Sequence, residues 1–328
     1  MTKGKVTVLG INGHIGRFTA QAFAAAGWDV TGMGRTDKYK LNGIRFMAGD
    51  AESVEDMRRA IGDTEVVVNA LNLPYHTWFN GRMEAQMTRV LAAMGTTGKT
   101  MLFPGNIYNY AADNAVLTPD LPQVPATPRG AIRVRVEAMF REAAERGDLQ
   151  AIVLRAGDFY APHSGGDWFD QIIFREIAKR KVSLIGTKGV GHSWAYLPDL
   201  GRAFEALASV RSTLPGFDTF HFAGHFVTPA EMEAAIAKAS PVPLKISAFP
   251  FALLRLIGIV DPVIREVAKM GYIWRSPLQL KDARLDELLG ENFATPFERA
   301  VAATAMPFLD SLAPASQALE AKAKPRMA

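Results

Sequence analysis

The sequence predicts an α/β protein with a doubly wound parallel sheet, followed by a smaller and mostly helical lobe. Short apolar runs alternate with amphipathic segments up to about residue 157, and this regularity is lost after Gly157. Runs that are apolar at nearly every residue, such as Val66–Val68, are typical of strands buried on both faces of a parallel sheet. Alternating strands and helices of this size predict a doubly wound sheet.

The elements of the first part follow from these patterns. We expect strands at Lys5–Leu9, Asp29–Met33, Ile44–Met47, Glu65–Asn69, Thr100–Phe103 and Gln150–Leu154. We expect helices near 17–26, 54–61, 78–93 and 130–146. The chain then divides into a first domain at 1–157, a lobe formed mainly by 158–312 and a flexible tail at 313–328.

The second part has weaker patterns. Thr228 and Glu231 form a capping box, with Pro229 at the first helical position. The other elements that we expect are a helix at 168–180, a hairpin of 182–185 with 192–196, a helix capped by Asp199 and running to Val210, and a strand near 217–222 that returns to the main sheet.

The first strand ends in three glycines spaced by three residues, Gly10, Gly13 and Gly16, and a helical pattern follows at once. Glycine permits a tight turn and a close backbone approach, and the helix N-terminus offers free N–H groups to a diphosphate. A strand before the glycines and a helix after them make this motif specific. We therefore expect 1–157 to be a dinucleotide-binding domain of the Rossmann type, although an ordinary glycine-rich turn is the alternative.

The composition is that of a globular protein. The chain has 328 residues, of which 48% are hydrophobic and 21% charged, a formal net charge of +4 and no cysteine. Without cysteine, disulfides, thiolate nucleophiles and zinc–thiolate sites are excluded, and no His/Asp/Glu cluster has the spacing of metal ligands. The small charge predicts no nucleic-acid partner.

Targeting and membrane segments are not expected. The first strand begins at residue 5, which predicts no signal peptide, and no run approaches the roughly 18 apolar residues of a membrane span. The run Phe249–Val260 is short and interrupted by Arg255. We expect a cytoplasmic protein with a small-molecule substrate, and we leave a homodimer open.

Five segments carry a resemblance to a known superfamily: the glycine motif, Gly49–Asp50, Leu102–Tyr110, Leu154–Pro162 and Trp194–Asp199. With them the chain resembles the extended or atypical short-chain dehydrogenases/reductases, and in particular the proteins named NAD-dependent epimerase/dehydratase. The resemblance covers the chain to about residue 310. It implies a nicotinamide cofactor and an oxidoreductase or epimerase reaction.

The end of the second strand bears on the choice between NADP and NAD. An acidic residue there would bind the adenosine ribose and repel a 2′-phosphate, but the strand ends in Gly34, Arg35 and Thr36. Arg35 can pair with a phosphate, so we expect NADP and leave NAD open. By resemblance Asp50 would bind adenine; its alternative role is to cap the next helix. The full set of expected cofactor residues is Gly10, Asn12, Gly13, His14, Ile15, Gly16, Arg35, Thr36, Asp50, Ala51, Leu71, Asn72 and Arg133.

Typical members of the superfamily carry Tyr-x-x-x-Lys on the helix after the fifth strand, and this chain departs from that pattern. Arg129 stands at the tyrosine position, Arg133 at the lysine position and Pro104 at that of a Ser or Thr. An arginine stays protonated and cannot be a general acid or base, although Arg129 could orient an anionic group and Arg133 could bind the ribose. A solvated stripe on the helix is the alternative for both arginines.

A proton donor must therefore come from elsewhere near the nicotinamide. We expect Arg129, Arg133 and Tyr108 to form the catalytic set, although Tyr108 could simply be packed in the core. Other candidate donors are Tyr110 and His163. The expected substrate residues are Tyr75, His76, Trp78, Asn106, Tyr160 and Trp194. We favour an NADP-dependent enzyme acting on a small polar or anionic carbonyl or alcohol, and a non-catalytic NAD(P) sensor is the alternative.

Overall fold

The structure, a computed structural model, describes residues 2–251, 254 and 257–312. Its largest element is a seven-stranded sheet in the order β11–β7–β5–β4–β1–β2–β3, and every neighbouring pair is parallel. The predicted parallel sheet is therefore confirmed. Its strands are β1 (Lys5–Leu9), β2 (Asp29–Gly34), β3 (Ile44–Ala48), β4 (Val66–Asn69), β5 (Thr100–Asn106), β7 (Gln150–Ala156) and β11 (Phe217–His221).

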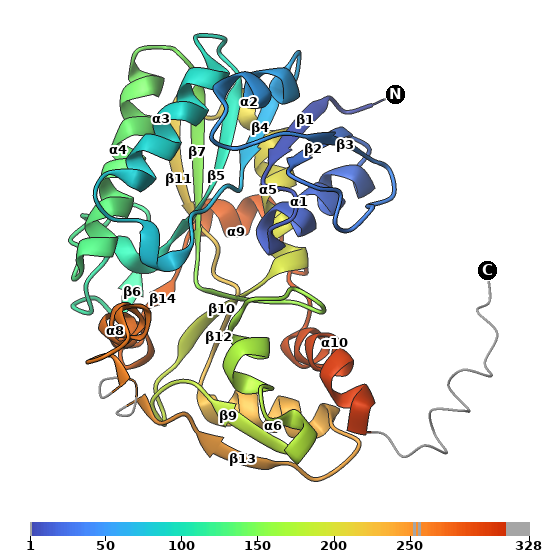
Figure 1. Ribbon diagram of the computed structural model, residues 1–328, viewed down its shortest axis with the longest axis vertical. Coiled ribbons are helices and arrows are strands. Elements are labelled where there is room, and N and C mark those ends of the chain that lie inside the picture. The colour runs from blue at the N-terminus through green and yellow to red at the C-terminus, as the bar shows by residue number, and fades with distance from the viewer. Residues whose placement is uncertain (1, 252–253, 255–256, 313–328) are drawn as a thin grey trace, which may run out of the picture.

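Helices cover both faces of this sheet (Figure 1). Alternate strand residues point to opposite faces, so Val66 and Val68 pack in the cluster that contains Phe23, whereas Val67 packs in the one that contains Met87. One face is covered by α1 (His14–Ala25) and α5 (Leu197–Ser209), and the other by α2 (Val54–Ile61), α3 (Arg82–Met94) and α4 (Pro128–Glu145).

The second lobe lies beyond the carboxyl ends of the strands (Figure 1). It contains a three-stranded sheet of β8 (Asp158–Tyr160), β10 (His192–Tyr196) and β12 (His225–Val227), and a two-stranded sheet of β9 (Lys181–Leu184) and β13 (Lys245–Ala248). Its helices are α6 (Pro229–Ala239), α8 (Pro262–Lys269) and α10 (Phe297–Leu309). Two further strands, β6 (Val116–Leu117) and β14 (Gln279–Leu280), pair with each other. Among the described residues no helix has both the length and the apolar character needed to cross a membrane.

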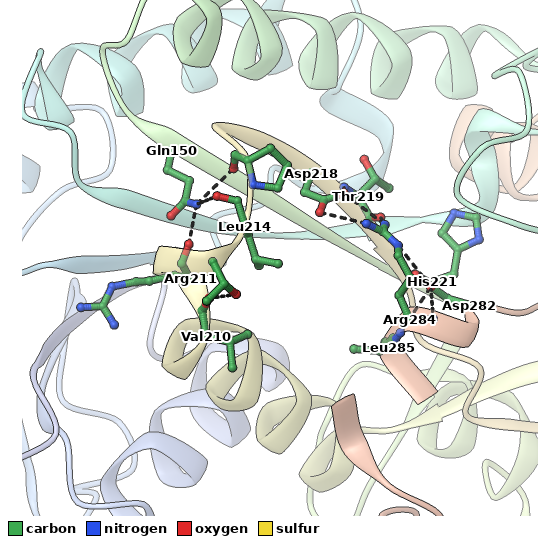
Figure 2. Close-up of polar contacts among 12 residues, drawn as sticks. Gln150, Val210, Arg211, Leu214, Asp218, Thr219, His221, Asp282, Arg284 and Leu285 are labelled. Carbon is green, nitrogen blue, oxygen red and sulfur yellow. Dashed lines mark hydrogen bonds and ion pairs between the residues drawn. The ribbon is translucent and has the colours of Figure 1, made fainter. Parts of the chain in front are cut away.

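The chain returns from the second lobe to the main sheet through α9 (Ala283–Leu289). Arg284 donates from both terminal nitrogens to the carboxylate of Asp218 on β11, each at 3.1 Å, and Asp282 caps α9 (Figure 2). The other oxygen of Asp282 accepts from the His221 backbone at 3.1 Å. These bonds fasten the late part of the chain to the edge strand β11.

Several expectations for the second part are confirmed and others are wrong. The returning strand is β11, and both hydrogen bonds of the capping box at Thr228 are present. The expected helix at 168–180 is instead a π turn at Phe169–Ile173 and a 3₁₀ turn at Ile177–Lys179. The expected tail lies outside the described residues, as does part of the apolar run near residue 255.

The expected hairpin is also wrong, because its two strands take other partners. Strand β9 pairs with β13, and β10 pairs with β8 and β12. Asp199 does not cap α5 but lies in its first turn, since its carboxylate accepts from the backbone N–H and the hydroxyl of Thr295 and from Arg202. In both cases the structure differs from the expectation because residues distant in the sequence supply the strand or hydrogen-bond partner.

Candidate active site

The turn between β1 and α1 has the geometry that the glycine motif predicts. Gly10 adopts a φ of 88°, which favours glycine, and a Cβ on Gly16 would lie 2.4 Å from the carbonyl oxygen of Gly10. Gly13 is the N-cap of α1 and has no side chain to bond the first turn. The first N–H groups of α1 have no intrahelical partner, so this end of the helix can bind an anion.

A cleft of about 420 Å³ opens beside this turn. It lies at the carboxyl ends of β4, β5 and β7, where ligands bind in doubly wound sheets. Many of the expected site residues line it together, namely Asn12, Gly13, His14, Ile15, Leu71, Asn72, Tyr75, Trp78, Asn106, Tyr108 and Arg133. The structure thus brings the glycine turn, the segment after β4 and the helix α4 to one cavity.

The residues expected at the adenosine end lie outside this cleft. Arg35 is exposed, and the carbonyl oxygen of Thr36 accepts from the Asn12 side chain at 2.7 Å. Asp50 is exposed and accepts from the backbone of Glu52 at 3.0 Å, and Ala51 is half-buried. The alternative role of Asp50 as a helix cap is wrong, because α2 begins at Val54 with Ser53 as its N-cap. Contact of these residues with a cofactor stays a prediction.

Arg133 is buried in the wall of the cleft. The alternative interpretation, in which it belongs to a solvent-exposed stripe on the helix, is therefore wrong. The residue is 7% exposed. Its guanidinium carbon lies 4.4 Å from the centre of the Trp78 ring and 5.4 Å from that of Phe103. Its Nε has no hydrogen-bond partner among the described residues. Burial lowers the pKa of Arg133 to about 10, so the side chain remains a cation at neutral pH.

Arg129 is also buried, but it does not line the cleft. Its Nη1 donates to the carbonyl oxygen of Tyr75, and its guanidinium carbon lies 3.5 Å from the centre of the Tyr75 ring. Its Nη2 lies 3.5 Å from the carboxylate of Glu266 on α8. Arg129 therefore supports a wall residue and faces a carboxylate of the chain itself, which leaves its expected catalytic role a prediction without geometric support.

Two tyrosines line the cleft near Arg133. Burial raises the pKa of Tyr108 well above 10, and the neighbouring Tyr75 and Asp158 raise it further while Arg133 opposes them. Burial also raises the pKa of Tyr75 to about 12. Both phenols are therefore protonated at neutral pH, and each can donate a hydrogen bond but is a poor base.

The remaining candidates lie away from the cleft. His76 is exposed and does not line it. Tyr160 and Trp194 are buried in the second lobe, where the hydroxyl of Tyr160 lies 2.6 Å from Nδ1 of His225. Tyr110 accepts from Arg155 through its hydroxyl at 2.8 Å, which engages it in the core. His163 lies in a loop with a φ of 53°, and its carbonyl oxygen accepts from Arg17.

The cleft also contains residues that the sequence patterns did not single out. Lys38 and Tyr39 after β2, Asp158 at the start of β8, and Ser164 and Gly165 in the following loop all line it. Asp158 belongs to a segment that carries the family resemblance, but its partners lie far away in the sequence. No spacing motif joins it to His192 or Trp274, so only the packing of the second lobe reveals this cluster.

Comparisons with known proteins agree with this arrangement. The model of the NAD dependent epimerase/dehydratase family matches residues 6–218. The chain belongs to this family. The match spans the main sheet from β1 into β11 and includes the glycine turn, α4 and the cleft-lining start of β8. Membership supports the expectation of an enzyme that uses a nicotinamide cofactor.

Solved structures of the family's fold are similar over nearly the whole chain. MoeE5 in complex with UDP-glucose and NAD has a TM-score of 0.74 at 19% identity, covering 94% of this chain and 100% of that one. The UDP-glucuronic acid 4-epimerase of Bacillus cereus has a TM-score of 0.73 at 14% identity, with coverage of 94% and 100%. The UDP-N-acetylglucosamine 4-epimerase of Methanobrevibacter ruminantium M1 has a TM-score of 0.74 at 16% identity, covering 95% and 100%. No curated protein matches the chain.

Proposed function

We propose that this protein is an NAD(P)-dependent oxidoreductase or epimerase-like enzyme that acts on a carbonyl or alcohol group of a small polar substrate. The observation that carries the proposal is the meeting of the glycine turn, the buried cation Arg133 and the hydroxyl of Tyr108 in one cleft. A small polar or anionic substrate was expected, and Arg129 was the residue that could orient an anionic group. Arg129 instead contacts Tyr75 and Glu266, so we propose a polar substrate without that requirement.

The residues present fit a nicotinamide dinucleotide. The crowding at Gly16 leaves no room for a side chain in the turn, and the first N–H groups of α1 can receive the diphosphate. Arg133 lines the cleft, so its guanidinium can donate to a ribose hydroxyl. Such a cofactor, when bound, supplies or accepts a hydride. We propose NADP as the preferred form because β2 ends at Gly34 and is followed by Arg35 and Thr36, without a carboxylate.

Tyr108 is the proposed proton donor. Burial raises its pKa, which makes it a weaker acid but leaves the phenol protonated at neutral pH, so it can donate a hydrogen bond to a substrate carbonyl oxygen and give up its proton once charge develops there. Arg133 favours the phenolate that remains, which then takes a proton from water. Trp78 and Phe103 enclose Arg133 on the apolar side and limit the access of water. This arrangement favours reduction of a carbonyl over removal of a proton from an alcohol.

A non-catalytic NAD(P)-binding sensor is the second candidate. It is favoured by the pKa values of Tyr75 and Tyr108, which are both raised, and by the replacement of Tyr-x-x-x-Lys with two arginines. A protein of this kind would keep the dinucleotide cleft and lose the proton transfer.

Two measurements on one preparation separate these functions. NADPH and NADH are first titrated against the protein by nicotinamide fluorescence, and oxidation of the bound form is then followed with a panel of small aldehydes and ketones. Saturable binding with oxidation supports the enzyme. Tight binding without oxidation of any member supports the sensor, and failure of both dinucleotides to bind overturns both candidates.

A further inference from the structure

We propose that Asp158 is a specificity-determining residue, which requires the substrate to present a hydrogen-bond donor, a hydroxyl or an ammonium group, to its free carboxylate oxygen. The inference rests on the proposed function, because it names the class of substrate for the same cleft. A neutral polyol or an amino alcohol fits this requirement. A phosphate or carboxylate placed at this position does not, since it would meet a like charge.

The carboxylate of Asp158 is held in place from one side. Its Oδ2 accepts from Nε1 of Trp274 at 2.7 Å and lies 2.8 Å from Nε2 of His192. His192 lies on β10, the neighbour of β8, and the close approach of these strands depends on Gly157. A Cβ at residue 157 would lie 2.0 Å from the carbonyl oxygen of Ser193. The position of the Asp158 carboxylate therefore depends on how the second lobe packs.

Both ring nitrogens of His192 face oxygen atoms. Nδ1 lies 3.1 Å from the carbonyl oxygen of Ile273, which can only accept, and Nε2 faces the Asp158 carboxylate. With its hydrogen on Nε2, His192 donates to the same oxygen of Asp158 that accepts from Trp274.

The second oxygen of Asp158 is the part available to a ligand. Asp158 lines the cleft and its side chain is 11% exposed, whereas every hydrogen bond that its carboxylate makes to a described residue goes to Oδ2. This oxygen accepts no hydrogen bond from a described residue, and a substrate O–H or N–H in the cleft would form a charge-assisted bond with it.

The distribution of charge in the cleft points to the same class of substrate. Among the lining residues that the structure describes, Lys38 and Arg133 are the cations with long side chains and Asp158 is the only carboxylate. The two cations suit the diphosphate and ribose of the cofactor, which leaves Asp158 for the substrate. Burial is the largest cause of the raised pKa of Tyr108, and the charge of Asp158 is a smaller one. The electrostatic field of Asp158 therefore reaches the proposed proton donor.

The test uses the full chain saturated with NADPH and matched pairs of carbonyl compounds. The pairs are dihydroxyacetone with dihydroxyacetone phosphate, and glyceraldehyde with glyceraldehyde 3-phosphate. Wild type is compared with Asp158→Asn, whose amide oxygen can still accept from Trp274 and His192. Asp218→Asn is the control: the side chain of Asp218 on β11 is likewise 11% exposed, but it pairs with Arg284. The readouts are kcat/KM and, by calorimetry, the affinity of the NADPH-loaded protein.

We expect wild type and Asp218→Asn to prefer the unphosphorylated member of each pair by at least about tenfold, which corresponds to the free energy of one charge-assisted hydrogen bond. In Asp158→Asn this preference should fall to within about twofold. Preference for the phosphorylated member in wild type, an unchanged preference in Asp158→Asn, or no binding of any member overturns the inference. NADPH binding in the same samples tests the proposed function separately. If Asp158→Asn does not fold, Trp274→Phe, which removes one donor to Oδ2, must lower the preference at least about threefold.

Discussion

The guanidinium carbon of Arg129 lies 3.5 Å from the centre of the Tyr75 ring, while Nη1 of the same side chain donates to the Tyr75 carbonyl oxygen. This pair fastens α4 to the segment after β4 and holds Tyr75 against the cleft. The arginine at the tyrosine position of the family motif thus supports the wall, whereas Arg133, one turn later, enters the cleft itself.

This difference predicts unequal effects of two matched substitutions. Arg133→Met should weaken NADPH binding about tenfold or more, because it removes a charged donor to the nicotinamide ribose. Arg129→Met keeps the apolar stem and should change the affinity by no more than about twofold. Fluorescence titration of both variants checks this, and equal losses would contradict the assignment of Arg133 to the cofactor.

Arg35 should decide the preference for NADPH. Arg35→Ala should weaken NADPH binding about tenfold and leave NADH binding unchanged, since a phosphate–arginine pair is lost only with NADPH. The control for net charge is Arg299→Ala, which removes the same charge from an exposed position on α10 in the other lobe. Equal binding of NADPH and NADH by wild type and Arg35→Ala would end the proposal of NADP preference.

Tyr108→Phe should lower kcat about a hundredfold or more while the affinity for NADPH stays within about twofold, because the proposed proton donor is removed and the proposed cofactor contacts remain. Tyr75→Phe should have the smaller effect, since Tyr75 is not the proposed donor. Burial raises the pKa of Tyr108 well above 10, so the donor form is present at every pH below that value. No loss of the reduction rate from Tyr108 is therefore expected between about pH 6 and 9.

His221 should make the stability depend on pH. Burial and the neighbouring Arg155 lower its pKa from 6.5 to about 3. Between these values the unfolded chain binds a proton that the folded chain does not, so the free energy of unfolding should fall as the pH drops through 6.5 towards 3, by at most about 1.4 kcal/mol per pH unit from this group. Urea unfolding from pH 7 to 4 should show a shallower fall for His221→Gln than for wild type. Equal slopes would show that His221 contributes nothing.

The buried pair of Arg155 and Glu137 should be essential for the folded state. The two side chains are 1% and 2% exposed, and Arg155 also donates to the hydroxyl of Tyr110. Glu137→Gln leaves the guanidinium without a full counter-charge and should cost about 3 kcal/mol in the free energy of unfolding. Glu298→Gln removes one partner of the exposed Lys238–Glu298 pair and should cost less than about 1 kcal/mol. Similar losses for both variants would contradict this account.

Local patterns were sufficient for the main sheet and the glycine turn. Strands such as Val66–Val68 are buried on both faces, and Gly10 and Gly16 lie where the backbone approaches too closely for a side chain. Local patterns were insufficient wherever distant residues decide the outcome. Asp199 bonds Thr295 instead of capping α5, and β9 pairs with β13 across a long stretch of sequence.

The candidate site divides in the same way. The residues near the glycine turn and Arg133 on α4 could be named from the family motif, and they meet in one cleft. The burial of Arg129 against Tyr75 depends on the packing of α8, which no motif encodes. Asp158 was missed because its partners, His192 and Trp274, are distant in sequence and come together only through the pairing of β8 with β10 and the 3₁₀ turn at Met270–Trp274.

The most direct test of the central claim is a crystal structure of the protein with NADP⁺ bound. We expect the diphosphate within hydrogen-bond distance of the first backbone N–H groups of α1, next to Gly13, and the nicotinamide ribose beside Arg133. A dinucleotide bound elsewhere, or a glycine turn that remains closed to it at millimolar NADP⁺, would contradict the account.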